Sequence, residues 1–231
     1  MTRRVVGILG GMGPEATILL QQRLLTSVTA QDDSDHLPLL IDMNPQVPSR
    51  IAHLIEGTGI DPTPVLVAMA QRLQAAGATA LAMPCNTAHH YAAVIQSAVS
   101  IPLLNMVDLS VTKAAQKLEK GARVGMLASP AVKMVGVFDA AFAASGLAPL
   151  WPAQPDLMLQ AIRDIKARGD TPEARAQLAA AAAELAANGA DAVLVACSEF
   201  SMIADAVPQG ITAIDTVDIL AAAIKSHILN G

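Results

Sequence analysis

Two cysteines are the residues of this sequence best suited to chemistry. Cys85 lies in the segment MPCNTAHH and Cys197 in the segment VACSEFSM, and each follows a short apolar run and precedes polar residues. A thiolate can take a proton from a carbon atom and a thiol can return one. A lone cysteine is more often a small buried hydrophobic residue. Two in matching contexts favour a function in which one thiol removes a proton from one face of a carbon and the other delivers a proton to the opposite face.

Three polar residues directly after the cysteines, Asn86, Thr87 and Ser198, are candidates for binding a carboxylate. Each lies where a predicted strand ends and a predicted helix begins, and backbone N–H groups at such a point carry partial positive charge. The side chains add further hydrogen-bond donors. The same helix N-termini are expected to lower the pKa of a thiol from its free value of about 8.5, which would leave one thiolate and one thiol at neutral pH.

Two cations are candidates for binding a further anionic group. Arg50 lies in NPQVPSR, a loop with two prolines after the second predicted strand, at the same end of the predicted sheet as the cysteines. Lys166 lies late in a predicted helix, in IRDIKARG. For Lys166 the residues alone favour an exposed surface position.

The segment GILGGMGPEAT, residues 7–17, is a glycine-rich loop between a predicted strand and a predicted helix. It formally fits the G-x-G-x-x-G/A dinucleotide pattern, with Asp42 as the candidate ribose ligand. However, Asp42 lies 31 residues after the first glycine of that pattern, where about 20 are expected, and Glu15 would place a negative charge beside a pyrophosphate. Nucleotide binding is therefore the minor alternative, and the N–H groups of Met12 and Gly13 are expected to hold a smaller anion such as a carboxylate.

His89 and His90 follow Cys85 in the pattern C-x3-H-H. A zinc site needs more ligands than this, and no second cluster of Cys, His or acidic residues supplies them. We therefore expect no metal, and the proton transfer predicted for the two cysteines requires no electron-sink cofactor, so none is expected. His89, one helical turn beyond Cys85, is expected to support that cysteine, and His90 to be peripheral.

Short β-branched runs alternate along the chain with longer stretches of helical periodicity. This alternation is typical of a parallel β-sheet with helices on both faces. Asp61-Pro62 and Thr171-Pro172 each have the sequence of a helix N-cap followed by a first-turn proline, and Gly77 and Gly189 are expected to follow helices. Strands are expected at residues 4–9, 38–43, 80–83, 102–105, 123–127, 148–151, 192–196 and 213–215. Helices are expected at residues 15–30, 61–76, 87–97, 108–119, 131–145, 155–168, 172–188, 199–205 and 216–229.

The chain also repeats itself. Three pairs of segments match in order: QRLQAAGATALAMPCNTAHH (71–90) with AELAANGADAVLVACSEFSM (183–202), VVGILGG (5–11) with RVGMLAS (123–129), and IPLLNMVDLS (101–110) with ITAIDTVDIL (211–220). The offsets of 112, 118 and 110 residues are nearly constant, which favours duplication over a chance likeness of strand–turn–helix units. We predict two similar α/β half-domains related by a pseudo-two-fold axis, residues 1–120 and 121–231, with the segment near 210–231 crossing over to the first. The active site is expected between them, because ligands of open α/β sheets bind at the carboxyl ends of strands.

The composition excludes several classes of protein. Of 231 residues 53% are hydrophobic and 15% are charged, so the chain can bury a substantial core and is not intrinsically disordered. A net charge of −5 and only five aromatic residues (three Phe, one Trp and one Tyr) argue against nucleic-acid binding. No apolar run reaches the roughly 18 residues of a membrane span, and the N-terminal apolar run is too short for a signal peptide. We expect a cytoplasmic protein whose two cysteines are free thiols.

Four segments of this sequence resemble the cofactor-independent aspartate/glutamate racemases. They are GILGGMGPEAT at 7–17, NPQVPSR at 44–50, PCNTAH at 84–89 and the Cys197-Ser198-Glu199 segment, and they span nearly the whole chain. The resemblance implies that Cys85 and Cys197 are the two catalytic acid/bases and that Asn86, Thr87 and Ser198 bind the α-carboxylate. It also implies that Arg50 and Lys166 bind the side-chain carboxylate, and that the protein is a homodimer.

One segment departs from the family pattern. The family usually has Gly-Cys-Thr-Glu where this chain has Ala196-Cys197-Ser198-Glu199. Serine keeps the hydroxyl, so carboxylate binding is expected to survive. Ala196 and Phe200 are expected to narrow the pocket, which bears on the identity of the substrate more than on the type of reaction.

The expected function is therefore racemisation of a small acidic amino acid, aspartate before glutamate, by proton transfer between two cysteines. One alternative is a racemase or isomerase of another small acid or of a hydantoin. The other is a non-catalytic protein whose two halves close on a carboxylate.

Overall fold

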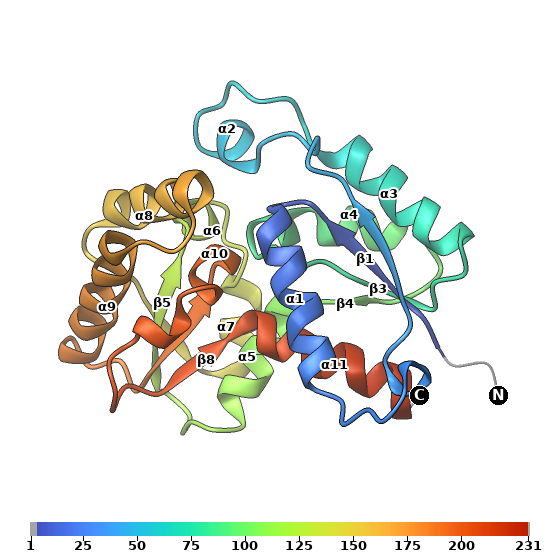
Figure 1. The fold of residues 1–231 in the computed structure, drawn as a ribbon. Helices are drawn as coiled ribbons and strands as arrows, with labels where there is room; N and C mark the ends of the chain where they lie inside the picture. The colour runs from blue at the N-terminus through green and yellow to red at the C-terminus, as the bar shows by residue number, and fades with distance from the viewer. Residues whose placement is uncertain (1–3, 231) are drawn as a thin grey trace.

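The computed structural model describes residues 4–230, and each half of the chain builds one four-stranded parallel sheet (Figure 1). The first sheet has the strand order β2-β1-β3-β4 and the second has the order β6-β5-β7-β8. This identical order confirms the predicted α/β architecture of two similar halves. The strands are β1 (Val6–Gly10), β2 (Leu39–Met43), β3 (Ala80–Ala82), β4 (Leu103–Leu104), β5 (Arg123–Ala128), β6 (Ala148–Leu150), β7 (Ala192–Ala196) and β8 (Ala213–Asp215).

The inner strands are apolar because helices cover both of their faces. Every residue of β1, β3 and β7 is buried, as expected for strands in the middle of a parallel sheet. The helices are α1 (Pro14–Thr26), α2 (Arg50–Leu54), α3 (Thr63–Ala75), α4 (Ala92–Ser97), α5 (Met106–Ala115), α6 (Pro130–Met134), α7 (Asp139–Ser145), α8 (Pro155–Arg168), α9 (Pro172–Ala187), α10 (Ser198–Ser201) and α11 (Thr216–Asn230). Short 3-10 turns lie at Asp33–Asp35, Thr87–Tyr91 and Ala204–Ala206.

The end signals of the helices mostly act as predicted. The Thr171 hydroxyl caps α9 by accepting a hydrogen bond from the Ala174 N–H at 3.2 Å. Gly77 and Gly189 follow α3 and α9 with φ of 98° and 86°, in the left-handed region that glycine enters without strain.

The predicted helix at 131–145 is two helices, α6 and α7, interrupted at Gly136, which has φ of 63°. The predicted helix at 199–205 is also shorter, because α10 ends at Ser201 and a 3-10 turn follows.

Two helices cross between the halves. Helix α5 packs Val107, Val111 and Ala114 into the apolar cluster that covers the second sheet. Helix α11, at the end of the chain, packs Val217 and Leu220 with the first sheet, and α5 and α11 also contact each other. The predicted halves, 1–120 and 121–231, assign α5 to the first half, whereas it covers the second sheet; residues 1–3 and 231 of those ranges lie outside the described residues.

No helix within residues 4–230 is both long enough and apolar enough to cross a membrane.

Candidate active site

A cavity of about 570 Å³ is lined by loops that follow the carboxyl ends of strands in both sheets. The first half contributes the loop after β1, the loop after β2 and the segment after β3, and the second half contributes the residues after β5 and β7 together with one face of α8. Both halves of the repeated sequence therefore supply the same structural feature, a strand end followed by polar residues. This is the place where open α/β sheets bind ligands.

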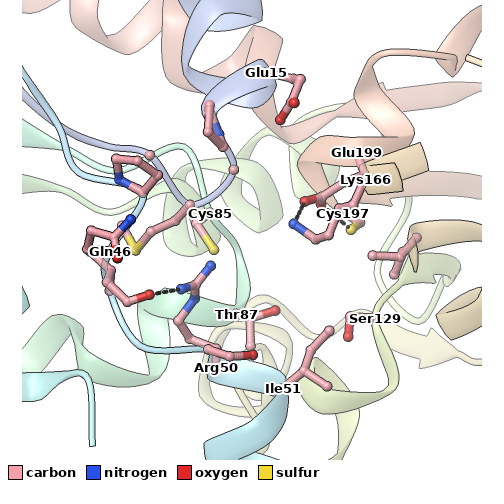
Figure 2. A pocket seen from close by; sticks show the side chains of 18 residues that line it. Glu15, Gln46, Arg50, Ile51, Cys85, Thr87, Ser129, Lys166, Cys197 and Glu199 are labelled. Carbon is pink, nitrogen blue, oxygen red and sulfur yellow. Dashed lines mark hydrogen bonds and ion pairs between the residues drawn. The ribbon is translucent and has the colours of Figure 1, made fainter. Parts of the chain in front are cut away.

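The two cysteines lie on opposite sides of this cavity (Figure 2). Cys85 follows β3 and Cys197 follows β7, and both cysteines are free and buried, with 7% of each residue exposed. The strands that they follow, β3 and β7, are equivalent, because each is the third strand of its half in chain order and occupies the same position in its sheet. The structure thus brings together two cysteines that are 112 residues apart in sequence.

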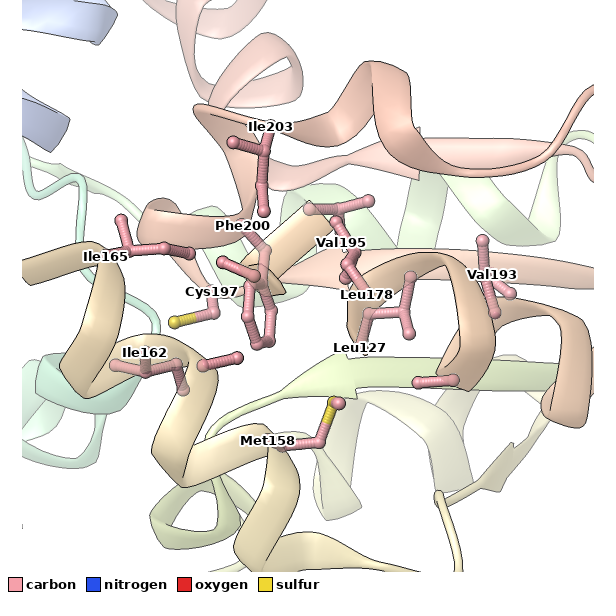
Figure 3. Packing of buried hydrophobic residues seen from close by; sticks show 14 of the residues in the cluster. Leu127, Met158, Ile162, Ile165, Leu178, Val193, Val195, Cys197, Phe200 and Ile203 are labelled. Atoms are coloured by element: carbon pink, nitrogen blue, oxygen red, sulfur yellow. The ribbon is translucent and has the colours of Figure 1, made fainter. Parts of the chain in front are cut away.

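The surroundings of Cys197 make its thiol a weak acid. Its side chain packs beside Ile162 and Ile165 of α8 and beside Phe200 (Figure 3). Burial, followed by the negative charge of Glu199 and the hydrogen bond to it, raises the pKa of Cys197 well above its usual value, although Lys166 opposes the shift. The expected net lowering of this thiol's pKa is therefore wrong for Cys197. The backbone N–H of Glu199, at the start of the four-residue helix α10, does lower the pKa, but burial and the neighbouring carboxylate outweigh it.

Cys85 is held through its backbone. The Nδ1 atom of His89 lies 2.9 Å from the Cys85 carbonyl oxygen, and the Met106 N–H donates to His89 Nε2 at 3.1 Å. These two contacts require a neutral imidazole with its proton on Nδ1. Burial lowers the pKa of His89 to about 4, against a smaller opposite effect of its hydrogen bond to Cys85. His89 therefore supports Cys85 as expected, and His90 is exposed beside the ring of Tyr91.

The candidate carboxylate ligands divide into two groups. Met12, Gly13 and Thr87 line the cavity. Asn86 and Ser198 are almost wholly buried and do not line it.

The amide of Asn86 donates instead to the Thr216 hydroxyl at 2.9 Å, and its own carbonyl oxygen has no hydrogen-bond partner. The role of Asn86 and Ser198 as substrate ligands stays a prediction.

Arg50 occupies the first turn of α2, a helix that is not among those predicted from the sequence. The Ser49 hydroxyl caps this helix by accepting from the Ala52 N–H at 3.2 Å. The guanidinium of Arg50 donates from Nη1 to the carbonyl oxygens of Val47 and Pro48, at 3.2 and 2.9 Å, while its buried Nε atom has no partner. Among the described residues no carboxylate pairs with Arg50, so its remaining donors are available to an anion in the cavity.

Lys166 lies at the cavity wall rather than on the outer surface. Helix α8 buries Met158, Ala161, Ile162 and Ile165 against the second half, and this leaves Lys166 at the edge of that face. Its ammonium group forms an ion pair with the buried carboxylate of Glu199. Burial lowers the pKa of Lys166, but the charge of Glu199 and the hydrogen bond to it outweigh burial and raise the pKa above its usual value.

Glu199 and Ser129 line the cavity but are not among the candidates from sequence. The internal repeat could have indicated both residues, because each aligns with a residue of the first half that lines the cavity. With an offset of 112 residues Glu199 aligns with Thr87, and with an offset of 118 residues Ser129 aligns with Gly11 of the glycine loop. Conversely, Ala196 and Phe200 are wholly buried and do not line the cavity, so neither narrows it directly.

Asp42, the candidate ribose ligand, forms an ion pair with Arg72 at 2.6 Å and does not line the cavity. The glycine loop itself needs its first glycine, because Gly11 has φ of 90° and a Cβ atom there would lie 2.3 Å from the backbone of Asn44.

Within residues 4–230 no group of three His, Cys, Asp or Glu side chains could hold a metal ion.

Comparison with known proteins identifies the class to which this fold and cavity belong. The family model of the Asp/Glu/hydantoin racemases matches residues 9–224. The chain therefore belongs to the Asp/Glu/hydantoin racemase family.

Among solved structures, the chain is similar to the Picrophilus torridus aspartate racemase, with a TM-score of 0.84, 28% sequence identity and coverage of 97% of this chain and 94% of the other. A putative Asp/Glu racemase from Yersinia pestis shares the fold, with a TM-score of 0.75, 19% identity and coverage of 98% and 99%. The broad specificity amino-acid racemase RacX of Bacillus subtilis is 28% identical over 125 residues, which are 52% of this chain and 54% of RacX. The chain thus matches about half the length of that relative.

Proposed function

We propose that this protein racemises aspartate without a cofactor, by proton transfer between Cys85 and Cys197. The observation that carries the proposal is that one cavity contains both thiols, supplied by equivalent strands of two repeated halves (Figure 2). A racemase must reach both faces of the substrate Cα atom, and two thiols on opposite sides of a bound substrate meet this requirement.

The cations of the cavity support an acidic substrate. Arg50 and Lys166 both line it, and charge-assisted hydrogen bonds to carboxylates are about twice as strong as neutral ones. An amino acid with a side-chain carboxylate brings a second negative group, and Arg50 and Lys166 together can bind it. Aspartate is the proposed substrate because the solved aspartate racemase from Picrophilus torridus covers nearly the whole chain at 28% identity.

The reaction is a transfer of protons between carbon and sulfur. In one direction the Cys85 thiolate takes the Cα proton and the Cys197 thiol delivers its proton to the opposite face. The environment of Cys197 favours its protonated form, which suits it to this role. The carbanion character of the intermediate is stabilised by hydrogen bonds to the α-carboxylate, from Thr87 and from the N–H groups of the glycine loop.

A chiral assay of each enantiomer of aspartate and glutamate in deuterated buffer, without added cofactor, tests the proposal. We expect each enantiomer of aspartate to yield the other with deuterium at Cα, and glutamate to react more slowly. Binding of aspartate with no deuterium incorporation would favour the carboxylate-binding alternative. Turnover of a hydantoin or another small acid, but not of aspartate, would contradict the proposed substrate and keep the class of reaction.

A further inference from the structure

We infer that Glu199 takes the proton from Cys197, and that the side-chain carboxylate of the substrate triggers this step by drawing Lys166 away from Glu199. The inference rests on the proposed two-cysteine reaction and assigns a catalytic role to a third residue. It also links recognition of an acidic side chain to activation of one thiol.

The position of Glu199 between two partners is the basis of this inference. The Cys197 thiol donates to Glu199 Oε2 at 3.0 Å, while Lys166 donates to Oε1. Each carboxylate oxygen thus has its own strong partner, one that can give up a proton and one that carries a positive charge (Figure 2). The Ser198 hydroxyl also lies 3.5 Å from Oε2.

In the absence of substrate this arrangement holds Cys197 in its thiol form. Burial raises the pKa of the Glu199 carboxyl, but the charge of Lys166 and the hydrogen bonds from Cys197 and Lys166 outweigh burial and keep it below its usual value. An ionised Glu199 accepts the S–H hydrogen bond and repels negative charge on the sulfur. Cys197 can therefore deliver a proton but needs help before it can take one.

A substrate can change this balance because Lys166 is accessible and Glu199 is not. The side chain of Lys166 is 37% exposed and that of Glu199 is 10% exposed, and both face the glycine loop. A Cβ atom built on Gly13 would lie 3.1 Å from Glu15 Oε2, 3.6 Å from Lys166 Nζ and 3.8 Å from Glu199 Oε1. A carboxylate that enters here competes directly for Lys166. A buried carboxylate that loses its cation becomes more basic.

The proton then moves from Cys197 to Glu199 with no change in the total charge of these two residues. The S–H bond of Cys197 breaks, an O–H bond forms at Glu199 Oε2, and the negative charge moves from the carboxylate to the sulfur. The new thiolate takes the Cα proton, and the Cys85 thiol gives its proton to the opposite face. When the product leaves, Lys166 returns to Glu199, which releases its proton to solvent, and Cys85 takes one up from solvent.

This coupling makes the two thiols respond differently to the substrate side chain. When each thiol exchanges the Cα proton alone, abstraction by Cys197 needs a carboxylate to draw Lys166 away, whereas abstraction by Cys85 does not. In complete racemisation both directions pass through the same states, so they share the displaced Lys166 and the protonated Glu199. Asparagine has the size of aspartate but a neutral side chain. Relative to aspartate, asparagine should therefore exchange its Cα proton much more slowly with Cys197, while its exchange with Cys85 should be affected far less.

The test uses single-cysteine proteins, in which only one thiol can exchange the Cα proton with deuterated solvent. In Cys85→Ser only Cys197 remains, and in Cys197→Ser only Cys85 remains. Adding Glu199→Gln should slow aspartate exchange about 100-fold in the Cys85→Ser protein, as expected for loss of a proton acceptor. In the Cys197→Ser protein the same change should slow exchange by a factor that is at least ~10-fold smaller. Glu119→Gln, the same change at an exposed position, is the matched control. Equal losses from Glu199→Gln in both proteins would overturn the inference.

A second measurement leaves Glu199 intact, so it does not depend on the folding of that variant. The preference for aspartate over asparagine, measured by Cα exchange, should be at least ~10-fold larger in Cys85→Ser than in Cys197→Ser. Equal preferences would overturn the inference and leave the two-cysteine reaction in place. If instead both single-cysteine proteins racemise aspartate at the parent rate, the proposed function itself fails.

Discussion

At the scale of single residues, the two cysteines are equivalent in the repeat but differ in chemical surroundings. His89 Nδ1 contacts the backbone carbonyl oxygen of Cys85. Ser201 is the residue equivalent to His89 in the second half, and its Oγ atom lies 3.4 Å from the carbonyl oxygen of Cys197. Among the hydrogen bonds of the described residues, the thiol of Cys197 donates to a carboxylate, that of Glu199, and the thiol of Cys85 does not. The repeated halves therefore give the two thiols different surroundings.

Arg50 is expected to select for the second carboxylate of the substrate. Replacing Arg50 with alanine removes charge-assisted hydrogen bonds of about 2 kcal/mol, so kcat/KM for aspartate should fall about 30-fold. The loss for asparagine should be several-fold smaller, because its side chain is neutral. The control is Arg168→Ala, which removes an exposed arginine paired with Asp164. Steady-state kinetics with equal losses for aspartate and asparagine would show that Arg50 does not recognise the side chain.

Two buried groups should make stability depend on pH in opposite ways. Burial lowers the pKa of His89 to about 4 from 6.5, so its contribution to stability is full above pH 6.5 and is lost as the pH falls toward 4. Burial also raises the pKa of Asp215 to about 6 from 3.8, despite hydrogen bonds from Ser201 and Val217. Its contribution is therefore full below pH 3.8 and is lost as the pH rises through 6. Each effect amounts to about 3 kcal/mol, so the two nearly cancel between pH 4 and 6.

Urea unfolding at several pH values can separate these two contributions. Compared with the parent, His89→Gln should lose less of its unfolding free energy between pH 6.5 and 4, whatever its stability at pH 7. Asp215→Asn should lose more over the same range. Parallel pH curves for the parent and both variants would contradict the assigned protonation states.

At the scale of helices and strands, sequence patterns predicted the buried elements well and the cavity wall poorly. The helix expected at residues 155–168 is α8 with the same bounds, because its apolar residues recur with helical spacing against one core. Helix α2 was missed because it has no buried residue, so no apolar face marked it in the sequence. Its single turn depends on the Ser49 cap in a loop with two prolines. Such local contacts leave little trace in hydrophobic periodicity.

The Ser49 cap should matter for binding more than for global stability. Loss of an N-cap costs about 1 kcal/mol, and in Ser49→Ala this cost falls on the one turn that carries Arg50. We expect a several-fold higher KM for aspartate and a nearly unchanged melting temperature. Thr171→Ala is the matched control, because it removes the cap of α9 outside the cavity wall. It should lower the melting temperature and leave KM unchanged, and the reverse pattern would contradict the role of α2.

At the scale of the whole molecule, the two halves share their cores. Helix α5 connects the sheets and covers the second one, while α11 returns from the second half to cover the first (Figure 1). The repeat in the sequence predicted the two similar sheets. Residue patterns could not predict that α5 covers the second sheet, because an apolar helix face does not specify which of two similar sheets it will cover.

This crossing predicts that the halves unfold together. Calorimetry should show one transition whose calorimetric and van't Hoff enthalpies agree, as in a two-state protein. Two separate transitions would show that each half is stable alone and that the crossed helices contribute little to the shared core.

The central claim is that Cys85 and Cys197 act on opposite faces of one Cα atom. The most direct test is deuterium incorporation into each enantiomer of aspartate by the Cys85→Ser and Cys197→Ser proteins. Because serine is a poor base at neutral pH, each variant should lose racemisation by orders of magnitude. Each should still exchange the Cα proton of one enantiomer, and the two variants should act on opposite enantiomers. Exchange of the same enantiomer by both variants, or racemisation at the parent rate by either, would contradict the claim.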